Sequence, residues 1–407
     1  MISLKILLMP IKEITVPASK SISNRVLVMA MFNHGNKILK NVLKCEDTEV
    51  MLEIYKQVSL DFEIINETRD SLDLNVSGPA KFEEASFYMN NSGTATRFLI
   101  PCLGLIKGKF KLDGCDRMRQ RPIADLVNAM RDIGVEIKYL EQDGFLPLEI
   151  ISNGNLKGVA KIKCDISSQY LSGLLIAQSF CNSFEIEVIG ESIVSKGYID
   201  LTKQVIQDFN LNSGYNVESD FSSASYFFAL GCLLKDGIKV NNLNPNSLQA
   251  DKDFLKALTE MGAKIVWSEN SVTVSCEKLN PILDYDCENF PDAAMTLAIL
   301  CAFADGDSKL TGLSTLKFKE SDRLSAIQTE LAKLGVSSEI DEESITIHGF
   351  GTKFNFITAK IETYNDHRIA MCFSLFRFFN PEIEILNPEC TAKTYPNYWE
   401  DFTYLTS

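Results

Sequence analysis

Six apolar stretches recur along the chain, and each of them begins with a short polar cluster. The clusters start at Ser19, Ser92, Ser167, Ser222, Asp292 and Asp366, so the successive steps are 73, 75, 55, 70 and 74 residues. A polar start followed by a run such as "SYFFALGCLL" or "AAMTLAILCAF" predicts a buried helix. The nearly constant period indicates one supersecondary unit that is used six times.

A second kind of helix alternates with the first. Apolar residues at i, i+3, i+4 and i+7 predict amphipathic helices in "IADLVNAMRDIGVEI", "DKDFLKALTEMGAKIV" and "DRLSAIQTELAKLGVSSEI". A glycine (Gly134, Gly262 or Gly335) is expected to end each helix before a strand. Alternating β-branched runs such as "SVTVSC" and "ESITIHGF" predict the strands. Six such mixed modules are enough for two similar domains, and the short step of 55 residues predicts that the third module has lost a hairpin.

Composition and charge narrow the class of protein. With 45% hydrophobic and 23% charged residues among 407, the chain is typical of a soluble globular protein. The net charge of −14 argues against a nucleic-acid partner. Eleven scattered cysteines without a C-x-x-C pair argue against a disulfide framework and a zinc site, and favour a reducing cytosol. The apolar runs are shorter than the roughly 18 residues of a membrane span, and we expect no leader peptide.

The polar helix starts carry an unusual amount of positive charge. In "SKSISNR", Lys20 adds a full charge where a helix start exposes unpaired N–H groups, and Ser21 and Arg25 share one helix face. The alternative is that Ser19 or Ser21 only caps the helix. Similar clusters follow in "NSGTATR", "RMRQRPIADL", "KFKESDRL" and "DHR". In an acidic protein, these clusters together favour an anion site with carboxylates beside it.

Eight motifs resemble, in order and spacing, those of the 5-enolpyruvylshikimate-3-phosphate synthase family, also called 3-phosphoshikimate 1-carboxyvinyltransferase. They are "PASKSISNR", "NSGTATR", "RMRQRPI", "SSQYLSGLL", "PDAAMT", "KESDR", "NDHRIAM" and "TAKTYP". The resemblance implies an α/β fold of two inside-out domains, each with three βαβαββ repeats and with helix N-termini facing the cleft between the domains. The implied domains are residues 19–217, with a shortened third repeat, and a discontinuous domain of residues 1–18 and 218–407.

The resemblance also implies a reaction and its ligands. The enolpyruvyl group of phosphoenolpyruvate would pass to the 5-hydroxyl of shikimate 3-phosphate with release of phosphate, by addition and elimination through a tetrahedral intermediate. No metal or organic cofactor is implied. The expected partners are these two small-molecule substrates, with no nucleic acid and no membrane, and we expect a cytoplasmic monomer.

Carried over position by position, the resemblance implies residues for both substrates and for catalysis. Shikimate 3-phosphate would be bound by Lys20, Ser21, Arg25, Ser167, Ser168, Gln169, Ser195, Tyr198, Asp292 and Lys319. Phosphoenolpyruvate would be bound by Lys20, Asn91, Gly93, Arg121, Gln169, Arg323, Arg368 and Lys393. The catalytic residues would be Lys20, Asp292 and Glu320. In this assignment Asp292 takes the proton from the hydroxyl and Glu320 acts at the methylene, and the reverse assignment stays open.

Two alternative functions and one departure from the pattern accompany this interpretation. The UDP-N-acetylglucosamine enolpyruvyl transferase family shares the fold and uses a catalytic cysteine in a loop comparable to "DGCDRMRQRP", which holds Cys115. The neighbours of Cys115 do not resemble that family's loop, so we interpret it as a thiol without a function. A non-catalytic binder of phosphorylated ligands would have no use for the carboxylates of Asp292 and Glu320. Thr315 and Leu316 stand where family members often carry asparagine or another polar residue.

Overall fold

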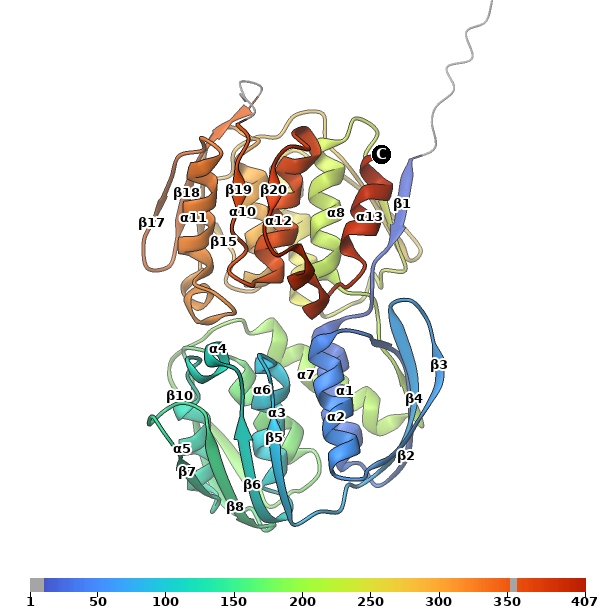
Figure 1. The fold of residues 1–407 in the computed structure, drawn as a ribbon, viewed down its shortest axis with the longest axis vertical. Coiled ribbons are helices and arrows are strands. Elements are labelled where there is room, and N and C mark those ends of the chain that lie inside the picture. The colour runs from blue at the N-terminus through green and yellow to red at the C-terminus, as the bar shows by residue number, and fades with distance from the viewer. Residues whose placement is uncertain (1–10, 352–356) are drawn as a thin grey trace, which may run out of the picture.

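Two separate hydrophobic cores divide the chain into two lobes (Figure 1). The structure, a computed structural model, describes residues 11–351 and 357–407. One core is built from residues within 18–217, and we call this part the N-terminal lobe. The other core combines residues 14–16 with residues within 221–405, and we call this part the C-terminal lobe.

The chain passes between the lobes twice, and the two crossings are bonded to each other. The N–H of Ser19 donates to the carbonyl of Glu218 at 2.8 Å, and the N–H of Asp220 donates to the carbonyl of Pro17 at 2.9 Å. We propose that the two cores mark the domains expected from the sequence, although residues 1–10 of that division lie outside the described residues.

The six apolar helices predicted from the repeat are present. They are α1 (Lys20–Phe32), α3 (Gly93–Leu103), α6 (Gln169–Gln178), α8 (Phe221–Leu233), α10 (Pro291–Cys301) and α12 (His367–Phe379). Each helix begins within two residues of the start of its polar cluster, so this prediction is confirmed. Nearly all residues of α1, α3 and α8 are buried, because these helices lie inside the lobes and are not packed on their surface.

The three amphipathic helices are confirmed as well, as α5 (Ala124–Asp132), α9 (Phe254–Glu260) and α11 (Arg323–Lys333). The glycines that follow have φ of +93° at Gly134, +96° at Gly262 and +78° at Gly335, the left-handed conformation that ends a helix and that favours glycine. Three further helices were not predicted, and they lack this glycine signal: α2 (Glu46–Gln57), α7 (Gly197–Leu211) and α13 (Tyr398–Thr406). Shorter helical turns are α4 (Asp116–Arg119), η1 (Ala250–Asp253), η2 (Ser314–Phe318) and η4 (Pro388–Lys393).

Within the described residues, each lobe contains two four-stranded sheets and one two-stranded sheet. The N-terminal lobe holds β2 (Gly35–Leu43), β3 (Asp61–Glu67), β4 (Ser71–Gly78), β5 (Glu84–Tyr88), β6 (Lys107–Asp113), β7 (Glu136–Tyr139), β8 (Leu148–Asn153), β9 (Gly158–Cys164), β10 (Phe184–Ile193) and β11 (Gly214–Asn216). The C-terminal lobe holds β1 (Lys12–Thr15), β12 (Ile238–Asn241), β13 (Lys264–Ser268), β14 (Ser271–Ser275), β15 (Tyr285–Asp286), β16 (Asp305–Thr311), β17 (Ser338–Ile340), β18 (Ile345–Phe350), β19 (Lys360–Ile361) and β20 (Glu384–Ile385).

The sheet orders are β11-β2-β4-β3, β5-β6-β8-β7 and β9-β10 in the N-terminal lobe, and β1-β12-β14-β13, β15-β16-β18-β17 and β19-β20 in the C-terminal lobe. Two of the four-stranded sheets are completed by a remote strand, since β1 pairs parallel with β12 and β11 pairs parallel with β2. The expected α/β fold of repeated strand and helix units is confirmed by these sheets. The sheets of both the third and the sixth unit have two strands where the structure describes them. The length of the sixth unit could not be predicted from the spacing of the polar clusters, because no further cluster follows it.

The lobes also touch away from the crossings. Arg69 of the N-terminal lobe donates two hydrogen bonds of 2.9 Å to the carboxylate of Asp401, in α13. On the side of α4, Arg117 donates to the carbonyl of Lys319 at 2.6 Å. These contacts join the two lobes directly. No helix within the described ranges is long and apolar enough to cross a membrane.

Candidate active site

A cavity lies between the lobes, at the starts of the apolar helices. It has an empty volume of about 650 Å³, which includes space open to solvent. The N-terminal lobe lines it with Lys20, Ser21, Arg25, Thr94, Phe98, Arg121, Ile166, Ser167, Ser168, Gln169, Val194, Ser195 and Tyr198. The C-terminal lobe lines it with Asp292, Thr315, Lys319, Glu320, Arg323 and Arg368. All site residues expected from the sequence are in these two groups except Asn91, Gly93 and Lys393, which lie beside the cavity.

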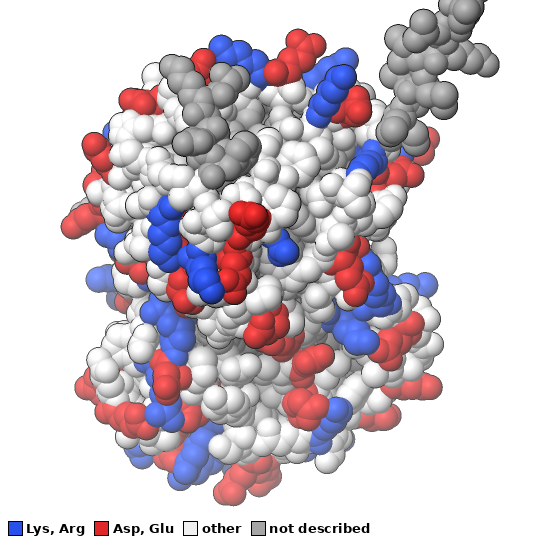
Figure 2. All heavy atoms as spheres, turned by 45° about the horizontal axis from the view of Figure 1, so that its top comes forward, with Lys and Arg blue, Asp and Glu red and all other residues white. Residues whose placement is uncertain are grey.

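The lining is strongly cationic although the chain carries a net charge of −14. Among the described residues, the lining has six cations (Lys20, Arg25, Arg121, Lys319, Arg323 and Arg368) and two carboxylates (Asp292 and Glu320). On the face shown in Figure 2, by contrast, residues of both signs are interspersed. The cavity is therefore suited to small molecules with several negative charges, drawn by local charge and by helix N-termini.

Arg323 organises the carboxylates of the C-terminal lobe. It is the first residue of α11 and its side chain is 1% exposed. Its Nε donates to Asp366 at 2.8 Å, its Nη1 to Asp292 at 2.9 Å and its Nη2 to Glu320 at 2.8 Å. Burial alone would lower the pKa of Arg323, but the three carboxylates outweigh it and raise that pKa. The guanidinium therefore fixes both candidate proton-transfer groups in place.

Asp292 and Glu320 are both held in the ionised form. Burial alone would raise the pKa of Asp292, but Arg368, Lys319 and Arg323 outweigh it and hold that pKa well below its ordinary value. The pKa of Glu320 is also held well below its usual range, because Arg323 and Arg121 outweigh the effect of burial. Each carboxylate can accept a proton directly, and each can donate one only after it has been protonated.

Arg368 and Lys319 surround Asp292 on its other sides. Nη2 of Arg368 donates to Asp292 at 3.1 Å, and Nη1 donates to the hydroxyl of Tyr226 at 3.2 Å. The Nζ of Lys319 lies 3.8 Å from Asp292, and burial lowers the pKa of this lysine. Asp292 is the second residue of α10, so it is not the N-cap of this helix. Its carboxylate is bound by two arginines, Arg323 and Arg368.

Arg25 lines the cavity and connects α1 to α7 by hydrogen bonds. Its Nε donates to the hydroxyl of Thr202 at 2.9 Å, and its Nη atoms donate to the carbonyls of Ser21 at 2.7 Å and Tyr198 at 3.2 Å. Burial lowers the pKa of Arg25 to about 10, so the side chain stays charged at neutral pH. Ser19 stands at the N-cap position of α1, as the capping alternative expects, but its buried hydroxyl makes no capping hydrogen bond.

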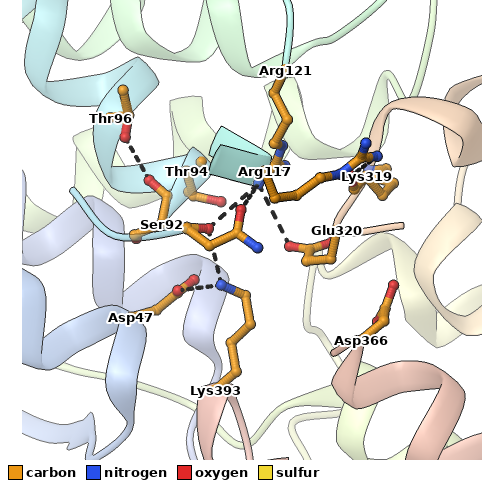
Figure 3. A network of polar contacts seen from close by, with 12 residues as sticks. Asp47, Ser92, Thr94, Thr96, Arg117, Arg121, Lys319, Glu320, Asp366 and Lys393 are labelled. Atoms are coloured by element: carbon orange, nitrogen blue, oxygen red, sulfur yellow. Dashed lines mark hydrogen bonds and ion pairs between the residues drawn. The ribbon is translucent and has the colours of Figure 1, made fainter. Parts of the chain in front are cut away.

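Lys393 reaches from the C-terminal lobe to the N-terminal lobe, as Figure 3 shows. Its Nζ donates to Asp47 at 3.0 Å and to the carbonyl of Asn91 at 2.9 Å. The Nζ of Lys20 lies 3.6 Å from the same carboxylate. Burial alone would lower the pKa of Lys393, but Asp47 and Glu320 outweigh it and raise that pKa. Asp47 therefore positions two cations, one from each lobe, at the edge of the cavity.

Gly93 and Arg121 are in close contact at the start of α3. A Cβ placed on Gly93 would lie 2.5 Å from Nη1 of Arg121, which is closer than real Cβ atoms come to any neighbour. Nη1 of Arg121 also lies 3.4 Å from the carbonyl and side-chain oxygens of Asn91, and 3.8 Å from Glu320. Only a glycine at position 93 leaves the Arg121 guanidinium in this place.

Sequence reasoning missed Asp47 and Asp251, two carboxylates that hold these side chains, because their local sequences carry no signal for a site and their partners are remote along the chain. It gave no role to the carboxylate of Asp366, although Asp366 starts one of the polar clusters. Thr315, which departs from the family pattern, lines the cavity with a buried hydroxyl that has no partner among the described atoms. Cys115 precedes α4, is half-buried and is not among the residues that line the cavity.

The sequence family described as EPSP synthase (3-phosphoshikimate 1-carboxyvinyltransferase) matches residues 11–213 and 210–402. The chain belongs to this family. It is 38% identical to the 3-phosphoshikimate 1-carboxyvinyltransferase of Mannheimia haemolytica, with 97% of this chain and 96% of that protein covered. It is 39% identical to the enzyme of the same name from Haemophilus influenzae strain PittGG, with 98% of each covered.

Solved structures agree with the EPSP synthase fold. The EPSP synthase of Acinetobacter baumannii superposes with a TM-score of 0.75 at 23% identity, over 96% of this chain and 94% of that one. The enolpyruvyl transferase NikO from Streptomyces tendae superposes with a TM-score of 0.72 at 16% identity, over 98% and 94%. Their low identities make these likenesses evidence for the fold alone.

Proposed function

We propose that the protein transfers the enolpyruvyl group of phosphoenolpyruvate to the 5-hydroxyl of shikimate 3-phosphate, giving 5-enolpyruvylshikimate 3-phosphate and phosphate. The observation that carries the proposal is the interlobe cavity, in which six cations and two ionised carboxylates meet. Membership of the EPSP synthase family supports the choice of substrates. Both substrates carry a phosphate and a carboxylate, which such a cavity can bind.

In the proposed reaction, one carboxylate removes the proton of the 5-hydroxyl while that oxygen bonds to the central carbon of phosphoenolpyruvate. The methylene carbon receives a proton from the Lys20 ammonium, or from the second carboxylate once that group has been protonated, which produces a tetrahedral intermediate. Loss of a proton from the methyl group then expels phosphate and restores the double bond. Asp292 and Glu320 are the groups for these proton transfers, and Lys20 offers a third at the edge of the cavity.

The ligand contacts proposed here are those that the resemblance to the EPSP synthase family implies for the residues in and beside the cavity. Ser167, Ser168, Ser195, Gln169 and Tyr198 would bind shikimate 3-phosphate together with the start of α1. Arg121, Lys393, Gly93 and Asn91 would bind the phosphate of phosphoenolpyruvate, and Arg323 and Arg368 would face its carboxylate. All these side chains come from one chain, which supports a functional monomer, and we propose that it acts in the cytoplasm.

A phosphate-release assay tests the proposal. Purified protein with phosphoenolpyruvate should release phosphate when shikimate 3-phosphate is added, and should release none with UDP-N-acetylglucosamine in its place. Release that depends on the nucleotide sugar alone would replace the proposed function by the sister activity. Absence of release with either acceptor would favour a non-catalytic binder.

Replacing Gly93 with alanine is expected to raise the KM for phosphoenolpyruvate by about 10- to 100-fold, the effect of losing one hydrogen bond to a charged group. The new methyl group would displace the Arg121 guanidinium, which lies 2.5 Å from its position. Steady-state kinetics at saturating shikimate 3-phosphate would measure the change.

Gly104, at the other end of α3, provides the matched control. Its nearest neighbour is the flexible methyl group of Met130, at 2.9 Å from an added Cβ, and its φ of −60° suits alanine. Gly104→Ala should leave the KM within twofold of wild type. Equal KM values for Gly93→Ala and wild type would show that Arg121 does not bind phosphoenolpyruvate.

Replacing Cys115 with serine is expected to leave phosphate release nearly unchanged. The cysteine lies outside the cavity lining, and its N–H donates to the carbonyl of Asn90 at 3.0 Å, a contact that serine keeps. Rates of wild type and variant at saturating substrates would be compared. Complete loss of activity with an unchanged melting temperature would move the protein to the cysteine-dependent sister family.

A further inference from the structure

Asp251 is a buried carboxylate behind the cavity that contacts both lobes. It lies in η1 of the C-terminal lobe and is 3% exposed. Its Oδ2 accepts hydrogen bonds from the hydroxyls of Tyr198 at 2.9 Å and Ser222 at 2.8 Å, and its Oδ1 accepts one from the N–H of Ala293 at 3.0 Å. Three donors therefore converge on one side chain that does not itself line the cavity.

The contact with Ala293 fixes the backbone next to Asp292. Ala293 is in the first turn of α10, where N–H groups have no acceptor within the helix. Phe290, at the N-cap position, has no side-chain oxygen to supply one. Asp251 supplies this acceptor, although it lies 42 positions before Ala293 in the chain. The start of α10, and with it Asp292, is thus anchored to η1.

The contact with Tyr198 crosses between the lobes. Tyr198 lies at the start of α7 in the N-terminal lobe and lines the cavity with its ring, while its hydroxyl is directed at Asp251. The preceding Gly197 lets the two lobes approach, since a Cβ on it would lie 2.7 Å from the Cβ of Ala250. The start of α7 therefore packs directly against η1.

We propose that Asp251 is a positioning residue which couples the placement of Tyr198, in one lobe, to that of Asp292, in the other. This inference rests on the proposed function, because it assigns Tyr198 to the shikimate 3-phosphate side of the cavity and Asp292 to proton transfer. The Tyr198 hydroxyl donates to Asp251 across the contact between the lobes. The same carboxylate holds the N–H beside Asp292, so one contact aligns the bound substrate with its base.

The charge of Asp251 agrees with a role in positioning as well as in packing. Burial and the nearby charge of Asp292 raise the pKa of Asp251 to about 6. At neutral pH the site therefore keeps two neighbouring carboxylates ionised, which costs free energy. A carboxylate offers acceptor oxygens to all three donors, whereas an asparagine would place an NH₂ group against at least one of them.

A double-mutant cycle with Asp251→Asn and Tyr198→Phe tests the inference. Each single variant should lower kcat by about tenfold, the effect of one hydrogen bond, and leave the KM for phosphoenolpyruvate within twofold. The double variant should be no slower than the slower single variant, because both changes break the same link. Effects that multiply in the double variant, or a kcat of either single variant equal to that of wild type, would overturn the proposal.

Ser222→Ala is the matched control, because Ser222 donates to the same oxygen from within the C-terminal lobe and lies outside the cavity lining. Its kcat should stay within twofold of wild type, and a tenfold loss would show that Asp251 acts only as a structural acceptor. If Asp251→Asn does not fold, as judged by circular dichroism, the inference is tested by comparing the kcat of Tyr198→Phe with that of Ser222→Ala.

A wild type that releases no phosphate would refute the proposed function, whereas an active wild type with unaffected variants would refute only this inference.

Discussion

Replacement of Arg323 by methionine is expected to lower the free energy of unfolding of the C-terminal lobe by about 3 to 5 kcal/mol. The side chain is 1% exposed and donates to three carboxylates, those of Asp292, Glu320 and Asp366. Methionine fills a similar volume and carries no charge. The three carboxylates, of which Glu320 and Asp366 are buried, would then lose their shared cation and repel each other.

Urea unfolding followed by tryptophan fluorescence would measure the loss of stability in the C-terminal lobe. The chain has two tryptophans, Trp267 in β13 and Trp399 in α13, and both belong to the C-terminal lobe. Lys256→Met is the control, because Lys256 is an exposed cation of α9 in the same lobe, paired with Asp253 at 2.6 Å. It should change the free energy of unfolding by less than about 0.5 kcal/mol. Equal losses in both variants would show that the carboxylate cluster does not depend on Arg323.

Replacement of Lys20 by methionine is expected to lower kcat/KM by about 10² to 10³, the range seen when one preorganised donor is removed from an active site. Lys20 is the first residue of α1 and lines the cavity. Its ion pair with Asp47 is long, at 3.6 Å, so the ammonium group is free to approach an anionic ligand. The loss should appear with both substrates, since the proposed function assigns Lys20 to both of them.

Phosphate release at varied concentrations of each substrate would measure this effect. Lys138→Met removes an exposed lysine of β7 that pairs with Glu136 at 2.8 Å, far from the cavity lining, and should keep wild-type kinetics. A kcat/KM for Lys20→Met within threefold of wild type would exclude Lys20 from binding and catalysis. Circular dichroism spectra identical to wild type would show that any loss is not due to unfolding.

Those residues of the candidate site that lie at the start of a helix could be predicted from the sequence. Lys20, Gln169, Asp292 and Arg368 lie within the first two residues of α1, α6, α10 and α12, and polar residues before long apolar runs are visible without a structure. Motif order then supplied the family and its residue roles. Asp47 and Asp251 could not be found in this way, because an acidic residue in a polar segment looks like any solvated carboxylate.

The repeat of about 70 residues, the two kinds of helix and the glycines that end three of them are visible in the sequence alone. These features depend on contacts between near neighbours along the chain, and local periodicity records such contacts directly. Which charges meet depends on the packing of the two lobes. Lys393 reaches Asp47 across 346 positions, and Arg69 binds Asp401 across 332. Such pairs form because two lobes close on each other, and no pattern within a single segment encodes the partner of a side chain in another lobe.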